Sequence, residues 1–86
     1  MGKHSDESWK EDQVIIQLSH SVDNADEAVG RARTNPTEER MNEAFEKIEK
    51  AERSCTNAIQ SRGNSKPVLE LQARLTESKD KLNQLH

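Results

Sequence analysis

The strongest constraint on this chain is a repeat of apolar residues, spaced alternately by three and four, in three separate segments. Such spacing places the apolar side chains of a segment on one face of an α-helix, and it is typical of helices that pack side by side. Each segment therefore predicts a helix with a single packing stripe. The stripes are Ile15, Leu18, Val22, Ala25, Val29 and Ala32; Met41, Ala44, Ile48, Ala51, Cys55 and Ala58; and Val68, Leu71, Leu75, Ser78, Leu82 and Leu85.

Helix-starting residues precede the first two stripes. Ser8 and Glu11 have the spacing of a capping box, with Ser5 as an alternative start. Asn35 followed by Pro36 predicts the start of the second helix, with Asn as the N-cap and Pro at the first position. We therefore expect helices over residues 8–33 and 36–62.

Gly63 predicts the end of the second helix, because glycine is the commonest residue just past a helix end. Asn64 or Ser65 is expected to cap a third helix near Pro67, over residues 66–85. Leu69, which lies off the third stripe, is expected to pack over the turn after Gly63.

Both connections are short, so neighbouring helices should run antiparallel. We expect an all-α, up-down-up three-helix bundle that forms one domain over residues 1–86, with residues 1–7 as a loose tail. An extended hairpin with a swapped third helix is the alternative. Gly30, inside the first predicted helix, is expected to mark a close approach between helices, and Phe45 is expected in the core.

The composition limits what such a bundle can do. Only 30% of the residues are hydrophobic, and there is one Trp, one Phe and no Tyr, which is too little for a core with a ligand cavity. We therefore expect neither an enzyme nor a bound cofactor. The single cysteine excludes an internal disulfide, and no apolar run is long enough for a membrane span, so we expect a cytoplasmic protein.

Sequence motifs for catalysis and metal binding are missing. The three glycines are scattered, and the histidines are far apart with no other ligands at suitable spacing, so we expect no metal site. Cys55 is expected to be a buried apolar side chain on its stripe. Ser19, His20 and Ser21 are expected to be solvated helix surface, because no third group completes a catalytic set.

The charge pattern argues against nucleic acid as a partner. The net charge is −3, and the acids and bases of the second segment alternate at the i,i+4 spacing of a solvated helix face. Residues 1–30 contain two lysines against seven acidic residues. The acidity is therefore concentrated in the first third of the chain.

A second apolar line runs along the first predicted helix, away from its stripe. Trp9 and Ile16 are seven residues apart and project from the back of the helix. An aromatic anchor with a polar border is typical of protein interfaces. The alternative is that Trp9 lies in a frayed helix end, or that Ile16 is a lone exposed apolar residue without a binding role. The predicted protein-interaction surface consists of Trp9, Asp12, Ile16, His20, Asp23 and Glu27.

The run Val29-Gly30-Arg31-Ala32, then Pro36, then Ala44, Ile48 and Ala51, followed by a leucine-rich last segment, is similar to small uncharacterised helical proteins of bacilli and their phages. The resemblance covers about residues 18–85. It implies a helical bundle and a bacterial or phage cytosolic setting, and it assigns no functional residue.

We therefore expect a small protein-interaction module, acting as a regulator, adaptor or inhibitor that docks onto another protein through its first helix. Two alternatives stay open. The chain is a self-assembling homodimer with Ile16 at the seam, or its acidic first third is a decoy for a basic protein surface. No nucleic acid and no membrane is expected as a partner.

Overall fold

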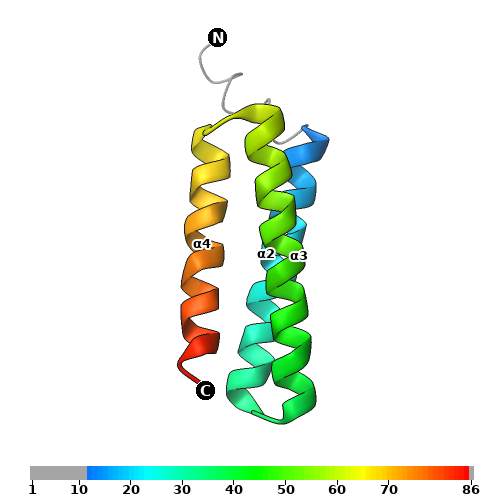
Figure 1. Cartoon of the computed structure of the whole chain (residues 1–86), viewed down its shortest axis with the longest axis vertical. Helices are drawn as coiled ribbons and strands as arrows, with labels where there is room; N and C mark the ends of the chain where they lie inside the picture. The colour runs from blue at the N-terminus through cyan, green and yellow to red at the C-terminus, as the bar shows by residue number, and fades with distance from the viewer. Residues whose placement is uncertain (1–11, 86) are drawn as a thin grey trace.

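The computed structural model describes residues 12–85, which form three α-helices in an up-down-up bundle. The helices are α2 (Gln13–Thr34), α3 (Glu38–Arg62) and α4 (Lys66–Asn83). Each helix packs against the other two, and the chain reverses direction at both short connections (Figure 1). The all-α three-helix bundle predicted from the stripes is confirmed.

The core consists of the three predicted stripes. All stripe residues are buried except Met41 and Leu85, which are partly buried against the core, and Ala28 joins them from α2. Alanine takes three of the six stripe positions of α3, so this helix has little side-chain volume at those positions. Burial of the branched residues, for which a full side chain contributes about 1.5–3 kcal/mol, holds the bundle together.

The start of α2 differs from the prediction. Asp12 has an extended backbone, and its carboxylate accepts a hydrogen bond from the backbone N–H of Val14 at 2.9 Å, so Asp12 is the N-cap. The prediction of an uninterrupted helix from residue 8 is therefore wrong. The predicted Ser8–Glu11 capping box, the tail over residues 1–7 and Trp9 lie outside the described residues.

The start of α3 also differs. Thr37, not Asn35, is its N-cap, and the Thr37 hydroxyl accepts a hydrogen bond from the backbone N–H of Arg40 at 3.2 Å. Asn35 instead closes α2 through its backbone N–H to Arg31. Starting at Glu38 puts two glutamates in the first turn, where the helix dipole favours negative charge.

The second connection is as predicted. Gly63 ends α3 with a φ of +73°, Ser65 is the N-cap of α4, and Pro67 lies in the first turn. The environment of Gly30 differs from the prediction. The residue is exposed, and a Cβ added there would meet nothing within 4 Å. The close helix approach expected at Gly30 is wrong, because the residue lies beside the stripe rather than on it.

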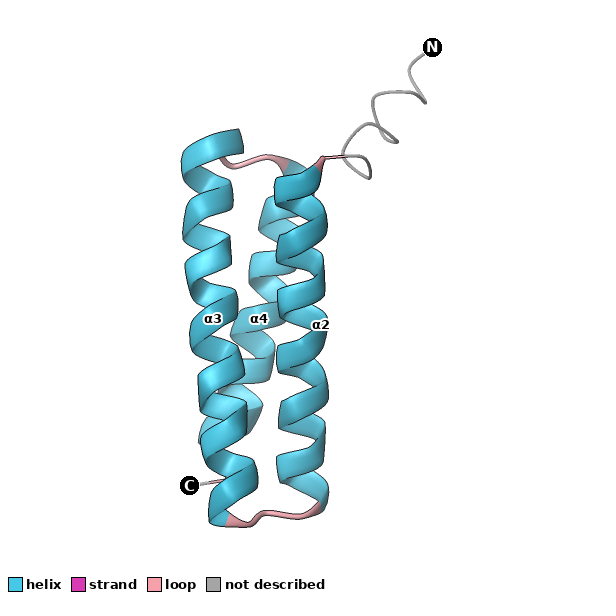
Figure 2. Cartoon of the chain, turned by 90° about the vertical axis from the view of Figure 1, so that its right-hand side faces the viewer, coloured by secondary structure: helices cyan, strands magenta, loops and turns pink. Residues whose placement is uncertain are grey.

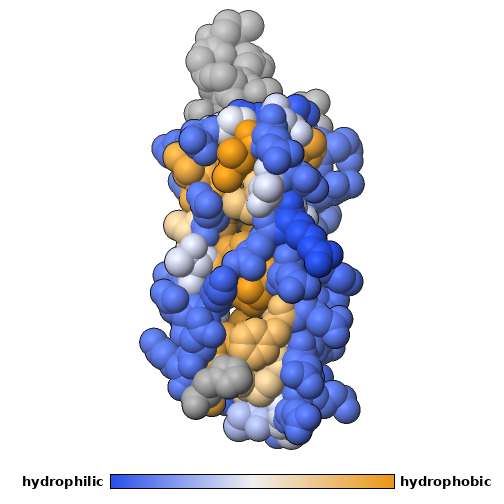
Figure 3. Space-filling view, viewed as in Figure 1, coloured by the Kyte–Doolittle hydropathy of each residue, from blue (hydrophilic) through white to orange (hydrophobic). Residues whose placement is uncertain are grey.

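The three sides of the bundle are not equally closed. Figure 2 shows α2 and α3 as a long hairpin with α4 behind it. In the space-filling view, apolar side chains are visible in a strip between α4 and α3, with hydrophilic side chains on both flanks (Figure 3). This side of the bundle leaves part of its apolar interior open to solvent.

Candidate interaction surface

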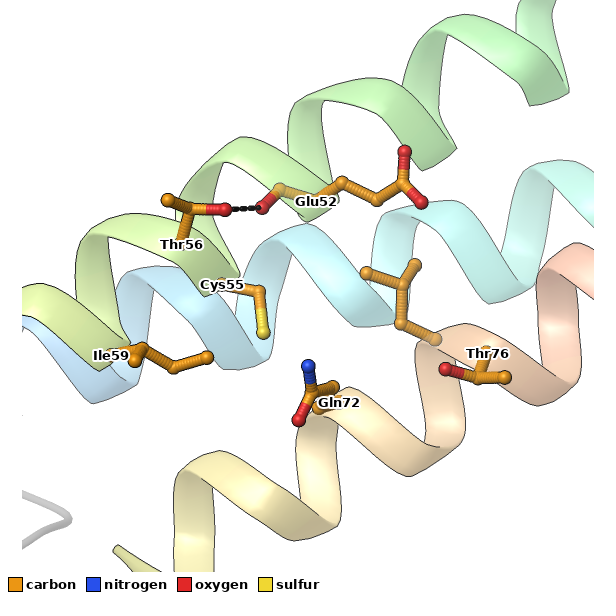
Figure 4. A pocket seen from close by; sticks show the side chains of 7 residues that line it. Glu52, Cys55, Thr56, Ile59, Gln72 and Thr76 are labelled. Atoms are coloured by element: carbon orange, nitrogen blue, oxygen red, sulfur yellow. Dashed lines mark hydrogen bonds between the residues drawn. The ribbon is translucent and has the colours of Figure 1, made fainter. Parts of the chain in front are cut away.

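A groove lies between α3 and α4, on the side where the apolar strip is visible. Two partly or fully buried apolar side chains come from α3 and one from α4, and the rest of the lining is polar. Figure 4 shows the side chains that line this α3/α4 groove, which are Glu52, Cys55, Thr56, Ile59, Gln72, Leu75 and Thr76.

Helix periodicity extends the groove beyond this lining. Seven residues complete nearly two turns, so Phe45 lies on the same line of α3 as Glu52 and Ile59. By the same spacing, Leu69 lies on the line of Thr76 along α4. Phe45 and Ile59 are partly buried against the core, and Leu69 is 45% exposed. The α3/α4 groove therefore carries apolar side chains toward both ends.

An ion pair crosses the groove near its middle. The Nζ of Lys79 donates to a carboxylate oxygen of Glu52 at 2.8 Å, and both side chains remain nearly half exposed. The hydrogen bond to Glu52 raises the pKa of Lys79 above its usual range. In Figure 3 hydrophilic side chains cross the apolar strip near its middle. This pair divides the groove into two apolar halves.

Cys55 forms part of the groove floor. It is 4% exposed, and in Figure 4 its side chain points from α3 toward Gln72 on α4. Burial raises the pKa of the Cys55 thiol, and the charge of Glu52 raises it further. A thiol with a raised pKa is a poor nucleophile at neutral pH. The predicted burial of Cys55 is confirmed.

The acidic residues predicted on the first helix do not form one free border. Asp12 pairs with Arg62 at the end of α3, with an Oδ1 to Nη2 distance of 3.0 Å. Its bonds to Arg62 hold the pKa of Asp12 below its usual range, although partial burial acts in the opposite direction. Asp12 is thus a clamp between α2 and α3.

Asp23 pairs with α4. The guanidinium of Arg74 donates to Asp23 at 2.9 Å and to Asp26 at 2.6 Å, and Asp26 also accepts a hydrogen bond from the buried hydroxyl of Ser78. The bonds to Asp23, and then to Asp26, raise the pKa of Arg74. These side chains connect α2 to α4, and Asp23 and Arg74 stay about half exposed while they do so.

The other predicted surface residues lie along the outside of α2. Glu27 pairs with Arg31 at 2.7 Å within the same helix, and His20 is exposed. Ile16 is partly buried, not fully exposed as predicted. Trp9, the main anchor of the predicted surface, lies outside the described residues, so the structure does not bring that surface together as a set.

The α3/α4 groove was not predicted from the sequence, although the sequence carries a signal for it. Phe45 and Ile59 are fourteen residues apart, so they share one line of α3 beside its main stripe. Phe45 was expected in the core and Leu69 over a turn. Phe45 packs against the core but is only partly buried, and Leu69 is 45% exposed.

Within residues 12–85, no group of three or more His, Cys, Asp or Glu side chains is arranged to hold a metal ion. None of α2, α3 and α4 combines the length and the apolar character needed to cross a bilayer.

Fold and groove together define the class of this chain, a small all-α three-helix bundle with an apolar strip exposed between α3 and α4. No protein-family model, curated protein or solved structure matches it. The resemblance to helical proteins of bacilli and their phages stays a prediction.

Proposed function

We propose that this chain is a protein-interaction module that receives an apolar segment of a partner protein in the α3/α4 groove. The observation that carries the proposal is the apolar strip between two hydrophilic flanks on the open side of the bundle, which hydrophilic side chains cross near its middle (Figure 3). Contiguous apolar surface with a polar rim marks binding sites for other macromolecules. The finer roles predicted from the sequence, a regulator, adaptor or inhibitor in the cytoplasm, stay predictions.

The chemistry of the groove supports binding rather than catalysis. Its thiol is buried with a raised pKa, and its two charged groups neutralise each other in an ion pair. A catalytic nucleophile needs an activating base or a lowered pKa. The lining instead offers contact area from three apolar and four polar side chains, which can receive a helix face.

The surface predicted on the first helix is a second candidate. The observation in its favour is that Ile16, an apolar residue off the main stripe, keeps part of its side chain in solvent next to the exposed helix face of His20. The acidic-decoy alternative has less support, because Asp12, Asp23 and Asp26 all pair with arginines of the other helices.

Affinity capture from bacterial lysate with matched variants tests the proposal. The baits are the wild type, the groove variant Phe45→Ser/Ile59→Ser, the first-helix variant Trp9→Ser/Ile16→Ser, and a control, Asn24→Ser, at an exposed polar position of α2. Circular dichroism first establishes that each bait is helical. We expect a partner that all baits capture except the groove variant.

Two results would contradict the groove. Loss of the partner only in the Trp9→Ser/Ile16→Ser variant assigns binding to the first helix. Capture of the same partner by all four baits excludes both surfaces.

A further inference from the structure

We infer that the α3/α4 groove receives a second copy of this chain, docked side by side with a twofold axis along the length of the bundle. This inference rests on the proposed function, because it requires the groove to bind a protein. It also specifies the partner, which is a second copy of the chain.

The Glu52–Lys79 ion pair fixes the level of α3 against α4. Ile59 and Phe45 are each seven residues from Glu52, so they lie about 10 Å above and below this level. Helix α4 runs in the opposite direction, so Gln72, seven residues before Lys79, lies at the level of Ile59. Each groove therefore has a charged middle and two apolar ends at fixed heights.

A twofold axis along the bundle keeps every residue at its height and exchanges the two helices. It places α3 of one copy opposite α4 of the other. Ile59 then faces the partner's Gln72, with the partner's Leu69 one turn above, and Phe45 faces the partner's Leu85. At the Phe45 end an apolar side chain thus meets an apolar side chain of the other copy, and at the Ile59 end Leu69, which is 45% exposed, lies one turn from the Ile59–Gln72 contact.

The charges favour this arrangement over its alternative. Glu52 of each copy faces the partner's Lys79, so the two ion pairs form a ring of four alternating charges. With the copies antiparallel and the twofold axis at the level of this ion pair, Glu52 would face the partner's Glu52, and Lys79 would face the partner's Lys79. Like charges placed opposite each other oppose binding, whereas complementary charges fix the register of an interface.

The rim of the groove agrees with the same arrangement. Within about one residue of equal height, Thr56 lies opposite the partner's Thr76, and Glu49 lies opposite the partner's Asn83, so no like charges meet there. The result is a four-helix core made of α3 and α4 from each copy, with each α2 on the outside. Antiparallel neighbours around a shared apolar core are the packing of four-helix bundles.

Sedimentation equilibrium of the full chain at micromolar concentration tests the second copy. We expect twice the chain mass of 9.8 kDa. Phe45→Ser/Ile59→Ser should raise the dimer dissociation constant by more than about 100-fold, because central apolar contacts dominate interface affinity. Circular dichroism establishes that the variant is still helical. A wild type that remains a monomer overturns the inference.

Two charge-reversal variants test the ring of charges, and a loss of folding in either variant cannot explain the expected result. Glu52→Lys and Lys79→Glu each lose the same ion pair within the chain and place like charges across the interface. We expect each variant alone to be monomeric and their equimolar mixture to form a heterodimer. Recovery on mixing reports only on contacts between chains. A mixture that stays monomeric overturns the inference.

Cross-linking tests the orientation. Asn42 lies ten residues below Glu52, so parallel copies place both Asn42 residues at one end, and antiparallel copies separate them by about 30 Å. In the variant Asn42→Cys/Cys55→Ala, a short bismaleimide should link the two chains. A dimer that this reagent does not link overturns the parallel arrangement.

Failure of this inference is distinguishable from failure of the proposed function. A monomer that captures a different protein, which the groove variant loses, contradicts the second copy and leaves the interaction module standing. A monomer that dimerises only after residues 1–11 are removed assigns the groove to that segment and overturns the inference. If the groove variant changes neither mass nor capture, both proposals are wrong.

Discussion

Among single residues, the two glycines of the described chain have opposite effects on the backbone. Gly30 lies inside α2 in open space, with nothing within 4 Å of an added Cβ. Gly63 ends α3 at φ +73° and ψ −165°. A helical backbone is easily adopted by alanine, whereas the region of Gly63 is populated almost only by glycine. The same substitution should therefore change stability in opposite directions.

Gly30→Ala should raise the free energy of unfolding by about 0.5–1 kcal/mol, because alanine loses less backbone entropy in a helix and meets no neighbour here. Urea unfolding followed by circular dichroism measures the change. A loss of stability would mean that Gly30 makes a close contact after all.

Gly63→Ala should lower the free energy of unfolding by about 1–3 kcal/mol, because the side chain would strain the backbone at the end of α3. The same urea titration measures it, with Gly30→Ala as the matched control for adding one methyl group. Equal stability of Gly63→Ala and the wild type would show that the connection adopts another conformation without strain.

At the scale of helices, the starts of the elements depend on which side chain caps the backbone. The sequence predicts Asn35 as the N-cap of α3. In the structure the Thr37 hydroxyl caps the helix instead, by accepting a hydrogen bond from the backbone N–H of Arg40. Thr37→Ala should therefore lower the free energy of unfolding by about 1 kcal/mol. Asn35→Ala is the control and should have little effect, because Asn35 closes α2 through its backbone. A larger cost for Asn35→Ala would restore the predicted cap.

The helical stripes were predictable because burial repeats every three or four residues and each stripe sums many small contributions. Helix starts were less predictable, since Asn35, Thr37 and their neighbours are all acceptable caps and only the packed backbone selects one. Gly30 was misassigned because a glycine beside a stripe and a glycine on it look alike in sequence.

The groove was not predicted because it depends on the spacing between helices. Phe45 and Ile59 lie beside the α3 stripe, where a side chain is covered or left open according to the position of the next helix. The sequence shows which face of each helix is apolar, but it does not show how wide the gap between α3 and α4 is. The predicted first-helix surface was built from one helix alone, so the pairing of Asp12 and Asp23 with distant arginines was not anticipated.

On the scale of the whole molecule, each pair of helices is joined by at least one polar contact that fixes its register. Helices α2 and α3 are joined by the Asp12–Arg62 pair and by the hydroxyls of Ser21 and Ser54, which lie 3.2 Å apart. Helices α2 and α4 are joined by Arg74, which pairs with Asp23 and Asp26. Helices α3 and α4 are joined by the Glu52–Lys79 pair. Exposed pairs add little stability individually. Their main effect on this alanine-rich core is to select one alignment of helices whose small side chains would pack in several.

The Asp12–Arg62 clamp predicts how stability depends on pH. The pKa of Asp12 is lower in the folded chain than its unfolded value of about 3.9, because Arg62 and the α2 backbone bond to its carboxylate. A lowered folded pKa stabilises the bundle above the unfolded pKa, and this contribution is lost as the pH falls through the folded pKa. Arg62 stays protonated over this range, so only the carboxylate titrates.

Asp12→Asn isolates this contribution, because asparagine caps a helix as well as aspartate does but carries no charge. The wild type should unfold at higher urea concentration than Asp12→Asn at pH 7, and the two midpoints should converge as the pH is lowered from 5 to about 2. The two proteins differ only at residue 12, so the difference between their midpoints reports on Asp12. A difference that stays constant down to pH 2 would mean that the clamp does not depend on the charge of Asp12, and the register of α2 against α3 would then have to come from apolar packing and the Ser21–Ser54 contact.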